Sequence, residues 1–190
     1  MKILLTLLVL LFSPSVIADD ISDFQIEGMS LGDSLLDYYS KTEIKNFHNY
    51  DNLPSSMKFR IAWFESDEFD LDLYDGMQVF YKPEDVNFII HGMNGFVNCF
   101  SKNECEKIFN NILSEVSIFF NNSKKTGGDT YNHSDDKSGK STYTNYYFEL
   151  VSGWASVEYL DWSKESGYGD NVRVQITNNE VDEWIQNGYF

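Results

Sequence analysis

Short runs of alternating apolar and polar residues, separated by turn signals, constrain the fold of this chain more than any other feature. Residues 59–63, 69–73 and 77–81 alternate in this way, and Asp75-Gly76 precedes the third run. An Asp-Gly pair favours the two-residue turn of a β-hairpin. Alternation of period two places apolar side chains on one face of a sheet and polar side chains on the other. The pattern therefore predicts an antiparallel sheet with one buried face.

The stretch 88–120 contains a further turn signal and one amphipathic helix. Asn94-Gly95 lies between apolar residues, and Asn and Gly best tolerate the positive φ angles of a type I′ turn, so we expect two short strands around this pair. Ser101 and Glu104 match the capping box that begins a helix. Apolar residues then recur at three- and four-residue steps, which predicts a helix buried along one stripe: Cys105, Ile108, Phe109, Ile112, Val116, Phe119 and Phe120.

Cys99 and Cys105 are the two cysteines of the chain. With Ser101 as the cap, Cys105 lies one turn into the helix, and its Cβ leans back toward the preceding strand. We therefore predict a disulfide between Cys99 and Cys105, which closes a loop of about seven residues and contributes about 2.4 kcal/mol by the chain-entropy relation. A redox or metal pair is the alternative, although the spacing is not Cys-x-x-Cys.

The remaining elements complete the predicted fold. Alternating runs at 143–151, 154–162 and 172–176 predict three more strands, and Thr177 with Glu180 predicts a cap for a short C-terminal helix. Residues 121–141 are rich in Asn, Ser, Lys, Gly and Asp, which predicts a mobile loop. We therefore expect an α+β fold in which an antiparallel sheet of hairpins carries about three to four helices packed on one side.

The first 18 residues have the composition of a secretory signal peptide. A basic start is followed by an apolar run of about ten residues and by Ala18 at the expected cleavage position. We therefore expect residues 19–190 to form a single periplasmic or secreted domain. That apolar run is too short to cross a bilayer. No later run approaches the length of a span, so no membrane span is expected after cleavage. Export is also consistent with a disulfide, because disulfides form and persist in oxidising compartments outside the cytoplasm.

The chain is strongly acidic, with a formal net charge of −16 at pH 7. Cleavage after Ala18 would remove Lys2, which leaves 13 basic against 30 acidic residues and a net charge of −17. A surface of this charge repels nucleic acid and anionic lipid, so neither is an expected partner. The charge suits a cationic partner, a divalent ion or simple solubility.

Two sets of residues are candidates for ligand binding. Asp70, Asp72 and Asp75 form a weak calcium candidate, but their spacing departs from that of an EF-hand loop, and Asp129, Asp135 and Asp136 are similar candidates. We therefore expect no metal and no cofactor. Aromatic residues crowd one pair of predicted strands and either fill the core or form a sugar-binding platform: Tyr143, Tyr146, Tyr147, Trp154, Tyr159 and Trp162.

Gly32-Asp33-Ser34-Leu35 resembles the motif that names the GDSL esterases and lipases, and the resemblance implies Ser34 as a nucleophile. A serine nucleophile needs a base, which that family supplies from an Asp-x-x-His block. None of the three histidines, His48, His91 and His133, has an Asp at the required position. A serine esterase that uses Ser34 is therefore the alternative function.

Residues 26–39 resemble the opening of a family of small uncharacterised exported bacterial proteins, and Asp161-Trp162-Ser163-Lys164 resembles a segment near that family's end. The resemblance implies no activity. The Gly-x-Ser opening is also faintly similar to periplasmic domains of the β-lactamase-inhibitor type, which bind proteins. The sequence has no complete catalytic set, so we expect a non-catalytic binding or interaction module whose partner is a protein or a carbohydrate.

Overall fold

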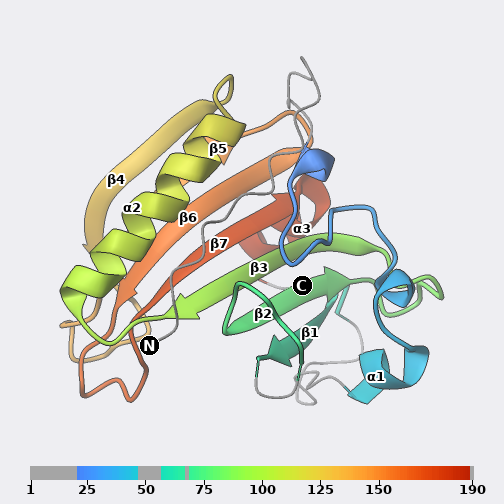
Figure 1. The fold of residues 1–190 in the computed structure, drawn as a ribbon, viewed down its shortest axis with the longest axis horizontal. Coiled ribbons are helices and arrows are strands. Elements are labelled where there is room, and N and C mark those ends of the chain that lie inside the picture. Colours follow the sequence, from blue (N-terminus) through green and yellow to red (C-terminus); the bar gives the residue numbers. More distant parts are fainter. Residues whose placement is uncertain (1–20, 47–56, 67–68, 189–190) are drawn as a thin grey trace.

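A computed structural model describes residues 21–46, 57–66 and 69–188, and its centre is one seven-stranded antiparallel sheet (Figure 1). The spatial order of the strands is β1-β2-β3-β7-β6-β5-β4. Consecutive strands are neighbours except at the centre, where β3 pairs with β7. The strands are β1 (Arg60–Glu65), β2 (Gly76–Tyr81), β3 (Ile90–Asn98), β4 (Lys124–Asn132), β5 (Thr142–Glu149), β6 (Gly153–Asp161) and β7 (Asn171–Asn178).

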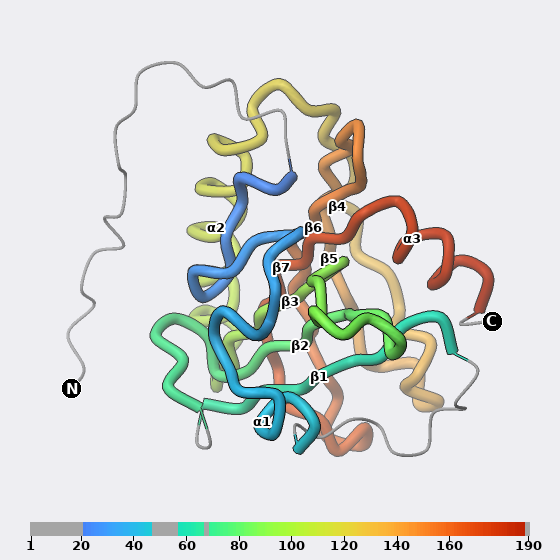
Figure 2. Tube along the Cα trace, turned by 90° about the vertical axis from the view of Figure 1, so that its right-hand side faces the viewer, coloured from blue at the N-terminus to red at the C-terminus, as the bar shows by residue number. Residues whose placement is uncertain are grey.

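The helices lie on both faces of this sheet. Figure 2 shows α2 (Lys102–Phe119) and the N-terminal segment on one side of the strands and α3 (Asn179–Gln186) on the other. The N-terminal segment contains the short helix α1 (Lys41–Asn46) and two 3₁₀ turns, Ile21–Asp23 and Leu35–Asp37. The expected α+β class with three to four helices packed on one side is therefore wrong. The molecule is dominated by its sheet, because part of the expected loop forms β4 and the two short strands expected around Asn94 are one continuous strand, β3, while α1 has only six residues.

The main core lies between the sheet and the α2 layer. Alternate residues of the strands point into it, and Val79, Met93, Val157, Val174 and Ile176 are each fully buried. A smaller core on the opposite face joins α3 to the strands β1 and β2: Phe59, Phe80, Val181 and Trp184. Because α3 has only eight residues, we expect it to leave much of its face uncovered, whereas α2 and the N-terminal segment share the other.

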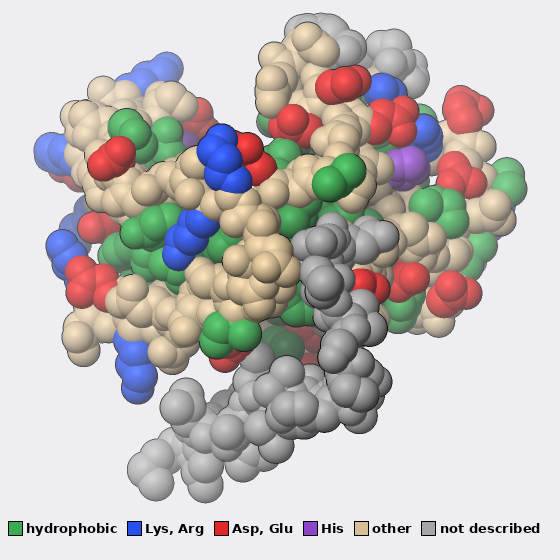
Figure 3. All heavy atoms as spheres, turned by 90° about the horizontal axis from the view of Figure 1, so that it is seen from above, with side chains coloured by type: hydrophobic (Ala, Val, Ile, Leu, Met, Phe, Trp, Pro, Cys, Tyr) green, Lys and Arg blue, Asp and Glu red, His purple; other side chains and the backbone are tan. Residues whose placement is uncertain are grey.

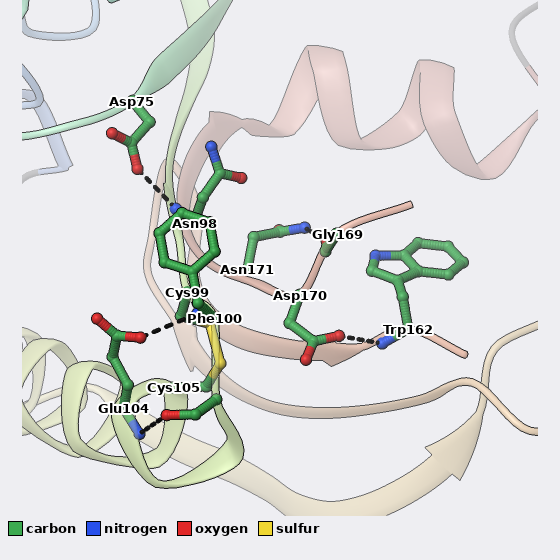
Figure 4. Close-up of a disulfide and its surroundings, with 11 residues drawn as sticks. Asp75, Asn98, Cys99, Phe100, Glu104, Cys105, Trp162, Gly169, Asp170 and Asn171 are labelled. Atoms are coloured by element: carbon green, nitrogen blue, oxygen red, sulfur yellow. Dashed lines mark hydrogen bonds between the residues drawn. A yellow bond between two sulfur atoms is a disulfide. The ribbon is translucent and has the colours of Figure 1, made fainter. Parts of the chain in front are cut away.

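The predicted disulfide is present and joins the end of β3 to the first turn of α2 (Figure 4). The Cα atoms of Cys99 and Cys105 lie 5.3 Å apart. The Ser101 hydroxyl accepts a hydrogen bond from the Glu104 amide at 3.3 Å, which confirms Ser101 as the cap. The Glu104 carboxylate in turn accepts from the Phe100 amide at 2.9 Å. The cap and the disulfide therefore fix the direction in which α2 leaves the sheet.

The expected hairpin at Asn94-Gly95 is wrong, because both residues lie in the middle of the continuous strand β3. Asn94 pairs with Gln78 on one side and with Gln175 on the other. Gly95 is required for a different reason: a Cβ there would come within 2.6 Å of the Tyr74 ring, which packs over the strand. The pair therefore serves side-chain packing rather than chain reversal.

Two further local expectations also fail. Residues 69–73 alternate like a strand, yet they form a bent connection in which the Glu27 carboxylate accepts hydrogen bonds from the Asp72, Leu73 and Tyr74 amides. Within the expected loop 121–141, Lys124–Asn132 is the edge strand β4. Pairing with β5 holds it in place although almost all of its residues are exposed, so it carries no apolar alternation. The expected signal peptide, residues 1–18, lies outside the described residues.

Candidate functional site

The sheet face that carries α3 contains an open cavity of about 830 Å³. Strands β2, β3, β7, β6 and β5 form its floor, and α3 forms one wall. The volume lies within the range of about 300–1,000 Å³ that is usual for small-molecule sites. This cavity is the candidate functional site, and we call it the sheet cavity.

A row of three carboxamide side chains crosses the floor of the sheet cavity. Gln78 on β2 pairs with Asn94 on β3, and Asn94 pairs with Gln175 on β7, so the three side chains are direct neighbours across the strands. Asn94 Nδ2 donates a hydrogen bond to Gln78 Oε1 at 2.7 Å. The Gln175 carboxamide, half-buried, makes no hydrogen bond to another described residue. The row therefore presents donors and acceptors to whatever fills the cavity.

Beside this row the floor carries a carboxyl group and a guanidinium group. Glu158 on β6 pairs with Arg173 on β7. Burial raises the pKa of Glu158, while the positive charge of Arg173 acts in the opposite direction. Arg173 Nε also donates a hydrogen bond to Asn171 Oδ1 at 3.0 Å, which orients the guanidinium. The two ionisable groups are therefore neighbours within the floor.

Two aromatic side chains from β5 and β6 also line the sheet cavity. The Trp154 and Tyr147 rings meet edge to face, with centroids 5.5 Å apart. Asn145 Nδ2 donates to the Tyr147 hydroxyl at 3.0 Å. Burial, followed by the negative charge of Glu158, raises the pKa of Tyr147 to about 12, so this hydroxyl stays protonated at neutral pH. The pair is therefore a rigid, uncharged platform.

The wall made by α3 contributes Trp184, Ile185, Asp182 and Gln186. The helix begins at Asn178, whose Oδ1 accepts from the Val181 amide at 2.9 Å. The expected cap was Thr177, one residue earlier; Thr177 is instead the penultimate residue of β7. The wall is tied to the sheet through this cap.

His91 on β3 supports the cap of α3. Because Asn178 Oδ1 faces α3, its Nδ2 is the atom that lies 3.1 Å from His91 Nδ1, which makes Nδ1 an acceptor. Burial, together with the charge of Lys82, lowers the pKa of His91. Glu180 forms ion pairs with Lys58 and Lys82 beside the ring. Neutral His91 therefore helps to hold the cavity wall in position.

The lining of the sheet cavity favours an uncharged ligand. Among the described residues that line it, the acidic side chains are those of Glu149, Glu158 and Asp182, and Arg173 has the single basic one. The whole chain has a net charge of −16. On the face seen in Figure 3, acidic and basic side chains lie among one another. An anionic ligand would therefore enter against the local and the overall field.

Ser34, the nucleophile of the alternative function, caps a short turn in the structure. Its hydroxyl donates to the Asn87 carbonyl at 2.5 Å and accepts from the Leu36 amide at 3.2 Å. In the described part of the chain, no hydrogen bond joins Ser34 to a histidine: His91 contacts Asn178, and His133 packs against Trp162. His48 lies outside the described residues. The geometry therefore offers Ser34 a capping role.

The carboxylates considered as calcium ligands have other roles or other neighbours. Asp75 accepts a hydrogen bond from the Asn98 amide at 2.7 Å (Figure 4). Asp136 accepts hydrogen bonds from Ser138, Ser141 and Ser163, which hold the pKa of this carboxyl well below its usual range. Across the described ranges, no three His, Cys, Asp or Glu side chains lie close enough together to hold a metal ion.

Of the six clustered aromatic residues, two line the sheet cavity, Tyr147 and Trp154. Tyr146 and Tyr159 point to the other face and stack near Phe109 of α2. The sequence did not identify the carboxamides of Gln78, Asn94 and Gln175 as site residues, and Asn94 was expected in a turn. Their signal is an amide at a polar position of an alternating strand, which becomes informative only when the strand order is known.

In the part of the chain that the structure describes, no helix is both long enough and apolar enough to cross a membrane. Comparisons of this chain with protein-family models, with curated proteins and with solved structures each found no match.

Proposed function

We propose that this protein is an exported, non-catalytic binding protein that holds a neutral carbohydrate in the sheet cavity. The observation that carries the proposal is the carboxamide row of Gln78, Asn94 and Gln175, which lines the sheet cavity together with the Trp154–Tyr147 pair and the α3 wall. The apolar N-terminal run and the disulfide support a location outside the cytoplasm.

Carboxamides suit hydroxyl groups because each carboxamide offers both donors and an acceptor, as a hydroxyl does. A sugar ring presents hydroxyls around its edge and apolar C–H groups on its faces. The amide row can therefore pair with the edge, while the Trp154 and Tyr147 rings cover a face. Protonated Tyr147 adds a hydroxyl without adding charge.

The acidic lining selects against sugars that carry carboxylate, phosphate or sulfate groups. The single cation, Arg173, already faces Glu158 across the strands. Moving an anion into this site would leave its charge uncompensated, which is costly. We therefore expect neutral sugars to bind better than acidic ones of the same size.

The test is a binding screen of the purified mature chain against neutral and acidic mono- and oligosaccharides, read by intrinsic tryptophan fluorescence. Trp154 and Trp184 both line the cavity, so ligand entry should change the emission. Gln175→Leu keeps the side chain's approximate size and removes its hydrogen bonds. It should weaken binding by about tenfold, the equivalent of about one hydrogen bond.

The matched control is Gln25→Leu, because Gln25 is exposed on the N-terminal segment and does not line the cavity. This variant should bind as the unmodified chain does. If no neutral saccharide changes the emission of the unmodified chain, or if both variants lose the same affinity, the sheet cavity is not a carbohydrate site.

A further inference from the structure

The sheet cavity has a neighbour on the same face of the sheet, at the β1 edge. A second cavity of about 390 Å³ is lined by Trp63, Glu65, Ser66, Asp75, Phe96 and Asn98. The described residues that line it include two acidic side chains and no basic one, so its charge preference matches that of the sheet cavity. We call it the edge cavity.

An aromatic pair forms the apolar part of the edge cavity. The Trp63 and Phe96 ring centroids lie 5.6 Å apart. The rings come from β1 and β3, and the strand between them carries Gly76 at this position. A Cβ on Gly76 would overlap the Phe96 ring, with Cε1 at 2.6 Å. The missing side chain therefore allows Phe96 to lie across β2 and reach Trp63.

Residues that line the two cavities are direct neighbours through the strand register. Trp63 of the edge cavity pairs with Gln78 of the sheet cavity, and Phe96 pairs with Arg173. Side chains at paired positions of an antiparallel sheet lie about 4.5–5.5 Å apart. A ligand group that leaves the carboxamide row toward β1 therefore meets the Trp63 ring next.

The row of paired positions that runs across the sheet from Trp63 to Tyr147 is longer than one sugar ring. From Trp63 on β1 to Tyr147 on β5 the path crosses β2, β3, β7 and β6, which is five strand spacings, or about 24 Å at about 4.8 Å each. A single ring occupies only a fraction of this length. Its two ends are both aromatic, and its middle is the carboxamide row.

From this arrangement we infer that the ligand is a linear neutral oligosaccharide that runs across the strands, with one unit in the sheet cavity and another against Trp63 and Phe96 in the edge cavity. The inference rests on the proposed function and extends it from a single sugar to a chain. The two aromatic pairs act as separate subsites, and the carboxamide row reads the units between them.

The test measures binding by calorimetry to glucose, to N-acetylglucosamine and to their linear oligomers of increasing length. Affinity should rise with length until a unit reaches the edge cavity, and the rise should be about tenfold, the value of one aromatic contact. Trp63→Ala should abolish this rise, so that the oligomers bind no more tightly than the single sugar.

A second variant guards against a folding defect in Trp63→Ala. Gly76→Ala displaces the Phe96 ring without removing an aromatic group, and it should also reduce the rise with length. The control is Tyr168→Ala, an exposed ring beside Trp162 that lines neither cavity. It should leave the length dependence intact.

The outcomes separate this inference from the proposed function. If single sugars and oligomers bind equally, or if the rise with length survives in Trp63→Ala, the two-subsite inference is wrong and the carbohydrate function stands. If none of these saccharides binds, the proposed function fails first. If an uncharged extended peptide binds more tightly than any saccharide, both are overturned.

Discussion

Replacing Gly153 with Ala should destabilise the protein more than any other single glycine substitution at an ordinary φ angle. Gly153 opens β6 and pairs with Asn178, the residue that caps α3. A Cβ on Gly153 would lie 2.8 Å from the Asn178 Cα and 2.9 Å from the Thr177 carbonyl carbon, and closer still to the Thr177 oxygen. All of these atoms belong to the backbone of β7, so no side-chain rotation can relieve the overlap.

The expected cost follows from this overlap. Forcing one extra methyl group into a packed region costs about 1–3 kcal/mol, and a clash with the backbone of a neighbouring strand belongs at the upper end. Replacing Gly by Ala also removes chain entropy from the unfolded state, which offsets about 0.4–1 kcal/mol. We therefore expect a net loss of about 2 kcal/mol in the free energy of unfolding. For a domain of this size that loss lowers Tm by about 4–8 °C.

The assay is urea unfolding of both variants, followed by tryptophan fluorescence. Gly169→Ala is the matched control, because no atom lies within 4 Å of a Cβ at Gly169 and its φ angle is ordinary. The control should be neutral or slightly more stable than the unmodified chain. If Gly153→Ala unfolds at the same urea concentration as Gly169→Ala, β6 and β7 do not approach each other as closely at Gly153 and Asn178 as this argument requires.

Four further outcomes follow from contacts described above. Replacing Cys99 and Cys105 with Ala should cost about 2.4 kcal/mol of stability, the loop entropy of the bridge, and reduction of the unmodified chain should cost the same. Ser34→Ala should lower stability by about 1 kcal/mol through loss of a cap, and a fluorophosphonate probe should leave Ser34 unlabelled in the unmodified chain. Because the pKa of Asp136 is lowered in the folded state, its contribution to the free energy of unfolding is complete above about pH 3.9 and is lost as the pH falls further. Asp136→Asn should therefore make stability depend less on pH in the acid range. Because the pKa of His91 is lowered in the folded state, its contribution to the free energy of unfolding is present above about pH 6.5 and is lost as the pH falls. In His91→Gln, stability should therefore fall less below that pH than it does in the unmodified chain.

Elements with a strong local pattern were predictable from the sequence. The helix α2 has an apolar stripe and a capping box, and β5, β6 and β7 alternate clearly, so all four are present. The disulfide followed from the position of Cys105 one turn into that helix. In each of these cases the residues that stabilise the element lie close together in the sequence.

The misplaced elements depend on distant partners. Strand β4 is held by the ladder to β5, and its exposed side chains give no signal of this. Asn94-Gly95 has the local chemistry of a turn, but pairing with β2 and β7 on its two sides keeps it extended. The candidate site could not be predicted from the sequence for the same reason, since Gln78, Asn94 and Gln175 become one row only through the β3–β7 pairing.

That pairing also sets when the site can exist during synthesis of the chain. Strands β1, β2 and β3 form one meander and β4, β5, β6 and β7 form another, and the β3–β7 ladder is the seam between them. Asn94 and Gln175 lie on opposite sides of this seam. A nascent chain that has not yet released β7 therefore lacks the strand that joins the two parts of the floor, and it has no α3 wall. Ligand binding should consequently require the complete sheet, because a fragment that ends before residue 171 contains Asn94 but not Gln175.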